Sequence, residues 1–164
     1  MKKVCLSLVL MMIASVFLVV QVIARPEDSA ISANCLAAQS ILKRLEKADI
    51  STRINRGSDY DKLLNLMFAM NARLASNRIA APELSEITAQ FSEAIDKFRS
   101  HYDGYNDDLD RVTDIKCNEK PGEFYDFLEK TRISRKKLHE DVGKLKELFS
   151  EYKNKLNALV EDRS

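Results

Sequence analysis

The chain has 164 residues, with 26 Lys and Arg against 25 Asp and Glu, a hydrophobic fraction of 45%, no Trp, 4 Gly and 3 Pro. This length allows one domain, or two at most. The balanced charge argues against a nucleic-acid binder, which normally carries an excess of basic residues. The scarcity of Gly and Pro argues against a β-sandwich or β-barrel, because those folds need many turns.

Residues 1–24 have the pattern of a secretory signal peptide. Two lysines follow the first Met, and residues 4–20 are almost continuously apolar. Val22 and Ala24 supply the short side chains of a cleavage site, so we predict cleavage after Ala24. The alternative is an uncleaved signal anchor, because about 20 apolar residues can cross a bilayer. In that case the chain would contact the membrane only through residues 4–24.

The composition changes when the signal peptide is removed. Residues 1–24 contain two Lys and no acidic residue, so their loss lowers the formal net charge from +1 to −1. The remainder is moderately polar and highly charged, which suits long amphipathic helices. We expect residues 25–30 to form a polar lead-in and residues 31–161 to form a single helical domain.

Four helical segments are predicted, at about residues 31–55, 59–80, 82–116 and 124–159. Arg56-Gly57-Ser58 indicates a break or a kink between the first two segments. Pro82 suits the first turn of the third, and residues 118–122 form a turn before the fourth. No alternation typical of a β-strand competes with this pattern.

Apolar residues in the last two segments repeat at intervals of 3 and 4. In the third segment they are Leu84, Ile87, Phe91, Ile95, Phe98, Tyr102, Tyr105, Leu109 and Val112. In the fourth segment the same positions hold Phe124, Leu128, Thr131, Arg135, Leu138, Val142, Leu145, Phe149, Tyr152, Leu156 and Leu159. A repeat averaging about 3.5 residues over this length is the signature of a coiled coil.

Cys35 and Cys117 are the two cysteines that remain after signal cleavage. An even number in an oxidising compartment favours a disulfide, whereas the alternative is two buried apolar thiols. An up-down four-helix bundle would hold these cysteines beyond the reach of a disulfide, about 7 Å between Cα atoms. If the first two segments form one kinked arm, both cysteines lie at the same end. We therefore predict an all-α fold, an elongated antiparallel three-helix coiled coil with a kinked first arm, with the four-helix bundle as the alternative.

Arg135 stands on an otherwise apolar seam. Antiparallel pairing around the turn near residue 119 places it opposite Tyr102 and close to His101. A charge on such a seam destabilises the fold unless it is paired or reaches solvent. We expect this polar layer to specify the pairing register, with Arg135 stacked on a tyrosine ring. The alternative is that the layer contacts a ligand.

A search for catalytic and cofactor-binding patterns identifies no candidate. The chain has two histidines, and His139-Glu140 lacks the second histidine of a zinc protease motif. Asp and Glu are abundant, but no feature selects a catalytic pair among them. The sequence therefore predicts a protein that is not an enzyme, with no metal and no cofactor.

A longer pattern covers residues 95–142 together with Cys35. It reads F-x3-Y-x2-Y-x3-L from Phe98, followed by D-x2-C-x3-P-x2-F-x3-L-x3-R-x2-R-x2-L from Asp114. This pattern resembles exported long-helix proteins of small-genome bacteria to which no activity is assigned. The resemblance implies an exported long-helix fold with a paired-cysteine tip, and it implies no activity.

An export signal joined to long heptads predicts a secreted, periplasmic or cell-surface protein. We expect a structural or interaction module of the cell envelope, with a protein or envelope component as its partner, no nucleic acid, and oligomers allowed. The alternative is a periplasmic chaperone-like or binding helical module. Met67, Phe68 and Met70 motivate it, because soft side chains adapt to varied partners.

Overall fold

The computed structural model describes residues 28–161, apart from the side chains of residues 28–33, 36, 50 and 52–54. The predicted signal peptide lies outside the described residues. Within them the chain is all-α, as predicted, and forms a helical bundle. Its helices are α2 (Asp28–Ser76), α3 (Pro82–Asp114) and α4 (Pro121–Glu161). α2 begins at Asp28, so the last three residues of the expected lead-in are helical.

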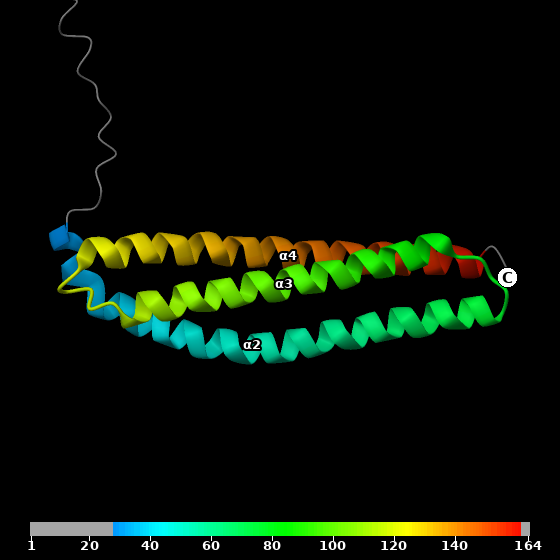
Figure 1. Ribbon diagram of the computed structural model, residues 1–164, viewed down its shortest axis with the longest axis horizontal. Coiled ribbons are helices and arrows are strands. Elements are labelled where there is room, and N and C mark those ends of the chain that lie inside the picture. Colours follow the sequence, from blue (N-terminus) through cyan, green and yellow to red (C-terminus); the bar gives the residue numbers. More distant parts are fainter. Residues whose placement is uncertain (1–27, 162–164) are drawn as a thin grey trace, which may run out of the picture.

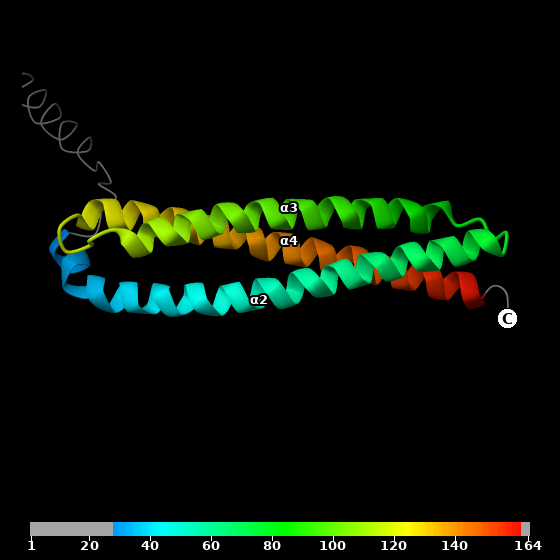
Figure 2. The same cartoon turned by 60° about the horizontal axis from the view of Figure 1, so that its bottom comes forward.

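The helices lie side by side along one long axis (Figures 1 and 2). α2 runs away from the end that holds the α3–α4 connection, α3 returns to it, and α4 runs away again. At about 1.5 Å per residue, the 49 residues of α2 extend about 73 Å. The 33 residues of α3 extend about 50 Å and the 41 residues of α4 about 60 Å.

A break or a kink was predicted at Arg56-Gly57-Ser58. α2 passes through these residues without interruption, so a break is wrong and the first two predicted segments form one helix. Gly57 has a negative φ, and a Cβ placed there would meet nothing within 4 Å. A helical Gly is less favourable than Ala by about 1 kcal/mol, which is small beside the packing of a long helix. The glycine therefore lowers the local helix propensity without ending the helix.

The α2–α3 connection is a Schellman turn. The Ile79 N–H donates to the Leu74 carbonyl at 2.9 Å, and the Arg78 N–H donates to the Ala75 carbonyl at 2.9 Å. Arg78 has a φ of 57°, the left-handed conformation that this turn requires and that Gly usually adopts. Pro82 then begins α3, where its missing N–H leaves no helical bond unmade.

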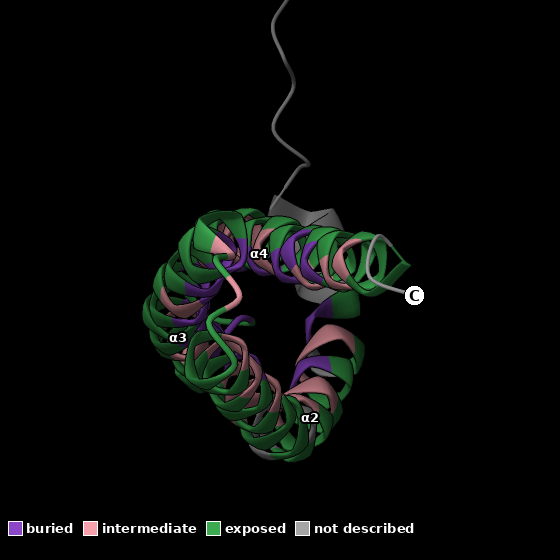
Figure 3. Ribbon diagram, turned by 90° about the vertical axis from the view of Figure 1, so that its right-hand side faces the viewer, coloured by how far each residue is buried: buried purple, intermediate pink, exposed green. Residues whose placement is uncertain are grey.

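The core follows the heptad positions of α3. All nine residues of the predicted α3 stripe are buried, and buried positions face the interior when the bundle is viewed along its axis (Figure 3). On α4, Leu138, Leu145 and Tyr152 are buried as predicted, and Leu148 joins them although it lies beside the stripe. Arg135 occupies a stripe position but is exposed, because its charged end reaches solvent.

Ion pairs join the helices at the surface. Arg99 Nη2 of α3 lies 2.6 Å from Asp61 Oδ1 of α2, and Lys155 Nζ of α4 lies 2.6 Å from Glu83 Oε2 of α3. The four side chains are about half exposed. Exposed pairs of this kind contribute about 0–1 kcal/mol each, so they support the arrangement rather than determine it.

Candidate functional site

The tip of the bundle is closed by a disulfide between Cys35 and Cys117. Their Cα atoms are 5.6 Å apart, and 82 residues separate them in the chain. Both residues are at most 1% exposed. The bond links the second turn of α2 to the connection between α3 and α4, and it confirms the predicted pairing.

Gln39 lies one helical turn after Cys35 and strengthens the same junction. Its side-chain amide donates to the carbonyl of Ile115, and to the carbonyl of Thr113 at 3.4 Å. These carbonyls belong to the end of α3, where the helix no longer supplies donors. A side chain of α2 therefore caps the C-terminal end of α3 beside the disulfide.

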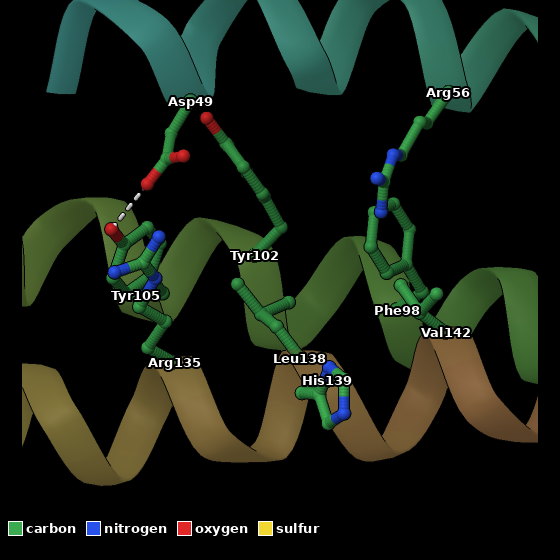
Figure 4. Close-up of a pocket in the computed structure, with 9 residues that line it drawn as sticks. All are labelled: Asp49, Arg56, Phe98, Tyr102, Tyr105, Arg135, Leu138, His139 and Val142. Atoms are coloured by element: carbon green, nitrogen blue, oxygen red, sulfur yellow. Dashed lines mark hydrogen bonds between the residues drawn. The ribbon is translucent and has the colours of Figure 1, made fainter. Parts of the chain in front are cut away.

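A cavity of about 340 Å³ lies in the middle of the bundle, between all three helices. Its walls are formed by the aromatic and aliphatic residues Phe98, Tyr102, Tyr105, Leu138 and Val142. Four charged or titratable residues of α2 and α4 also line it: Asp49, Arg56, Arg135 and His139 (Figure 4). Small-molecule pockets are usually concave and combine apolar walls with polar groups, and this cavity has both kinds of lining.

Asp49 and Tyr105 form a hydrogen bond across this cavity. The Tyr105 hydroxyl donates to Asp49 Oδ2 at 2.5 Å (Figure 4). Burial raises the pKa of Tyr105 well above its ordinary value, and the bond to Asp49 raises this pKa further. The nearby charge of Arg135 opposes both effects. Tyr105 therefore stays neutral and remains a donor through the physiological pH range.

Two guanidinium groups reach the cavity from opposite sides. Arg56 extends from α2 toward Phe98, and Arg135 extends from α4 toward Tyr105 (Figure 4). Both residues are exposed. Within residues 34–161, no described carboxylate forms an ion pair with either guanidinium.

The predicted polar layer is distributed over two places. Tyr102 and Arg135 line the same cavity. His101 lies on another face of α3, where its Nδ1 is 2.8 Å from Asp141 Oδ2 of α4. His139 is exposed and also lines the cavity.

A second polar layer, which the sequence analysis missed, joins all three helices near the other end of the bundle. The Tyr152 hydroxyl of α4 lies 2.9 Å from Asn71 Oδ1 and 3.2 Å from the Met67 carbonyl, both of α2. Asn71 Nδ2 donates to Thr88 Oγ1 of α3 at 2.9 Å. Thr88 also donates to the Leu84 carbonyl at 2.7 Å, so each buried hydroxyl has a partner.

Neither Asp49, Arg56 nor Asn71 was identified from the sequence. Each lies on a helix whose apolar pattern is weak, and polar residues are common on exposed helix faces. The one available signal was the position of Asn71, which lies between Met67 and Leu74 on the apolar side of α2. An amide at such a position predicts a partner on a facing helix.

The apolar face proposed for partner binding is divided by the structure. Met67 is 1% exposed and belongs to the core, whereas Phe68 is 53% exposed. Met70 is half-buried against the core. Phe68 is therefore the part of this face that remains open to solvent.

Across residues 28–161, no helix combines the length and apolar character needed to span a membrane. Among the side chains that the structure describes, no group of three His, Cys, Asp or Glu residues is arranged to hold a metal ion. Comparisons with protein-family models, curated proteins and solved structures found no match.

Proposed function

We propose that the chain is an exported, non-enzymatic helical rod that serves as a structural or interaction module of the cell envelope. The observation that carries this proposal is the Cys35–Cys117 disulfide, which closes one tip of a long helical bundle. In this view the folded unit is an antiparallel three-helix coiled coil. Its core is one narrow seam, and most of its surface is free for partners.

Export is supported by two independent features. A structural disulfide is stable in oxidising compartments and rare in reducing ones. The basic and apolar start of the chain has the form of a secretory signal. We place the protein in the periplasm, at the cell surface or in the medium.

The test begins with the full chain expressed in a secreting bacterial host. We expect recovery outside the cytoplasm, an N-terminus at Arg25, and a Cys35–Cys117 peptide in the non-reduced digest. A small-angle scattering profile should be that of a rod. A chain retained in the cytoplasm with both thiols free would contradict the export proposal.

The interaction role is tested in the cells from which the chain comes. A photo-crosslinking amino acid is placed at Ile41 or at Ile133, which are each 57% exposed. We expect one discrete envelope adduct in the wild-type background and its loss in the Cys35→Ser variant. An exported rod that yields no adduct at either position would contradict a partner along these faces.

A periplasmic chaperone-like role is the second candidate, supported by the exposed apolar residues of α2. Leu66 and Phe68 are 65% and 53% exposed. Such a module would suppress the aggregation of a denatured client at near-stoichiometric ratios, and Phe68→Ser would weaken that suppression. Unchanged aggregation in the presence of the wild-type chain would reject this candidate.

A further inference from the structure

We propose that the cavity between α2, α3 and α4 binds a small amphipathic carboxylate. Its apolar or aromatic body would contact Phe98 and Tyr102, and its carboxylate would be attracted by Arg56 and Arg135, which lie at opposite ends of the cavity (Figure 4). This proposal is independent of the role of the rod as a whole.

The size and the walls of the cavity define the body of the ligand. A volume of about 340 Å³ lies at the lower end of the range of small-molecule sites, about 300–1,000 Å³. Phe98 and Tyr102 are each 5% exposed and so are held firmly in the core. Only a small part of each ring lines the cavity, but that part is preformed, so an apolar group can contact it without rearrangement.

The charges at the cavity define the polar end of the ligand. Arg56 and Arg135 both line it, whereas Asp49 is the one carboxylate among the described residues that line it. Asp49 already accepts the hydrogen bond from Tyr105. The guanidinium groups therefore make an anion the favoured ligand, and the planar fork of Arg matches a carboxylate especially well.

The same charges disfavour other ligands of similar size. A cation would approach two guanidinium groups in order to reach a carboxylate that is already hydrogen-bonded. An uncharged aromatic molecule would gain the ring contacts but would leave both guanidinium groups with water alone. Discrimination between anion, neutral molecule and cation is therefore the signature of this site.

The experiment uses three indole probes with the oxidised full chain. Indole-3-acetate is the anion, indole-3-acetamide is its uncharged match, and tryptamine is its cationic match. Because the chain contains no Trp, indole fluorescence comes from the probe alone. We expect saturable binding of indole-3-acetate, and binding of the other two that is at least about ten-fold weaker.

Variants then locate the site. Arg56→Gln and Arg135→Gln should each weaken indole-3-acetate binding about ten-fold, because each removes one of the two positive charges that line the cavity. Val142→Phe should also weaken binding, because it fills the cavity and retains both arginines. Arg132→Gln is the matched control, since Arg132 is exposed on α4 and pairs with Glu129 away from the cavity.

Circular dichroism and the intact disulfide show that each variant is folded. The proposal is overturned if no probe binds saturably, or if the three probes bind equally. It is also overturned if the Arg56 and Arg135 variants bind like the wild type. An equal loss in the Arg132 variant would show attraction by the surface charge alone and would overturn it as well.

Discussion

The Tyr152 hydroxyl of α4 lies 2.9 Å from Asn71 Oδ1 of α2, at a point where both side chains face the interior of the bundle. Thr88 of α3 completes the layer through Asn71 Nδ2. An apolar seam alone tolerates a shift by one heptad, because apolar residues still meet apolar residues. A buried polar layer does not, since any shift leaves its donors and acceptors without partners.

Replacement of Tyr152 by Phe tests this layer. Loss of the Tyr152 hydroxyl leaves Asn71 Oδ1 and the Met67 carbonyl with one partner fewer. We therefore expect the free energy of unfolding to fall by about 1–2 kcal/mol. Denaturant unfolding followed by circular dichroism measures the change. Tyr125→Phe on the same helix is the control, because the Tyr125 hydroxyl has no hydrogen bond among the described residues. Equal effects of the two substitutions would contradict a special role for the layer.

Replacement of Arg78 by Gly should stabilise the protein. The left-handed φ of 57° is strained for Arg but free for Gly, and the net gain after the entropy of Gly is about 0.5–1 kcal/mol. Arg73→Gly, in the last turn of α2, should destabilise by a similar amount because it weakens a helix. The midpoint of thermal unfolding should rise in Arg78→Gly and fall in Arg73→Gly. A lower midpoint in Arg78→Gly would contradict the inference that the backbone of Arg78 is strained.

Removal of the disulfide should lower the free energy of unfolding by several kcal/mol. The bond closes a loop with a sequence separation of 82, for which the chain-entropy relation gives about 4–5 kcal/mol. We expect Cys35→Ser, Cys117→Ser and the double variant to have the same free energy of unfolding, because each removes the same bond. Reductant should lower the wild type to that level and leave the variants unchanged. If the wild type keeps its free energy of unfolding after the disulfide is fully reduced, packing alone stabilises the tip and the prediction is wrong.

Stability should fall at alkaline pH. Burial raises the pKa of Tyr105, with a further rise from Asp49, and burial also raises the pKa of Tyr152 and Tyr60. Above the ordinary tyrosine pKa of about 10, the unfolded chain loses these protons while the folded chain retains them, so the slope of stability against pH is negative. The stability that these tyrosines contribute is fully present below about pH 10, and it is lost as the pH rises toward their pKa values in the folded protein. Tyr105→Phe should make the slope shallower, and an unchanged slope in urea titrations would exclude Tyr105 as a cause.

The seam of α3 could be predicted because one physical signal dominates there. Leu84 through Val112 repeat at heptad spacing, and burial of that face is the main stabilising contribution of the helix. The disulfide could be predicted from the sequence for a different reason. Removal of the predicted signal peptide leaves two cysteines, so each has one possible partner within the chain. Their pairing favours the three-helix arrangement over the four-helix bundle, because only the former puts both cysteines at the same end.

The cavity could not be predicted, because it depends on how far α2 stands from the other two helices. Asp49 and Arg56 look like ordinary surface residues of a helix with a weak apolar pattern. Their proximity to Tyr105 and Arg135 follows from packing between helices, which no local pattern encodes. Of the break or kink expected at Gly57, the break was wrong for the opposite reason: the packing of the long helix overrides the low local helix propensity of Gly.

The disulfide at the tip also determines how the protein would carry tension. The start of α2 and the end of α4 lie at opposite ends of the bundle. A force applied between them enters at Cys35, crosses the sulfur–sulfur bond to Cys117, and continues along α4. The 82-residue separation between the two cysteines is thereby bypassed. Under load the oxidised chain can lengthen only outside this loop, so α3 and most of α2 bear no stretch until the bond is reduced.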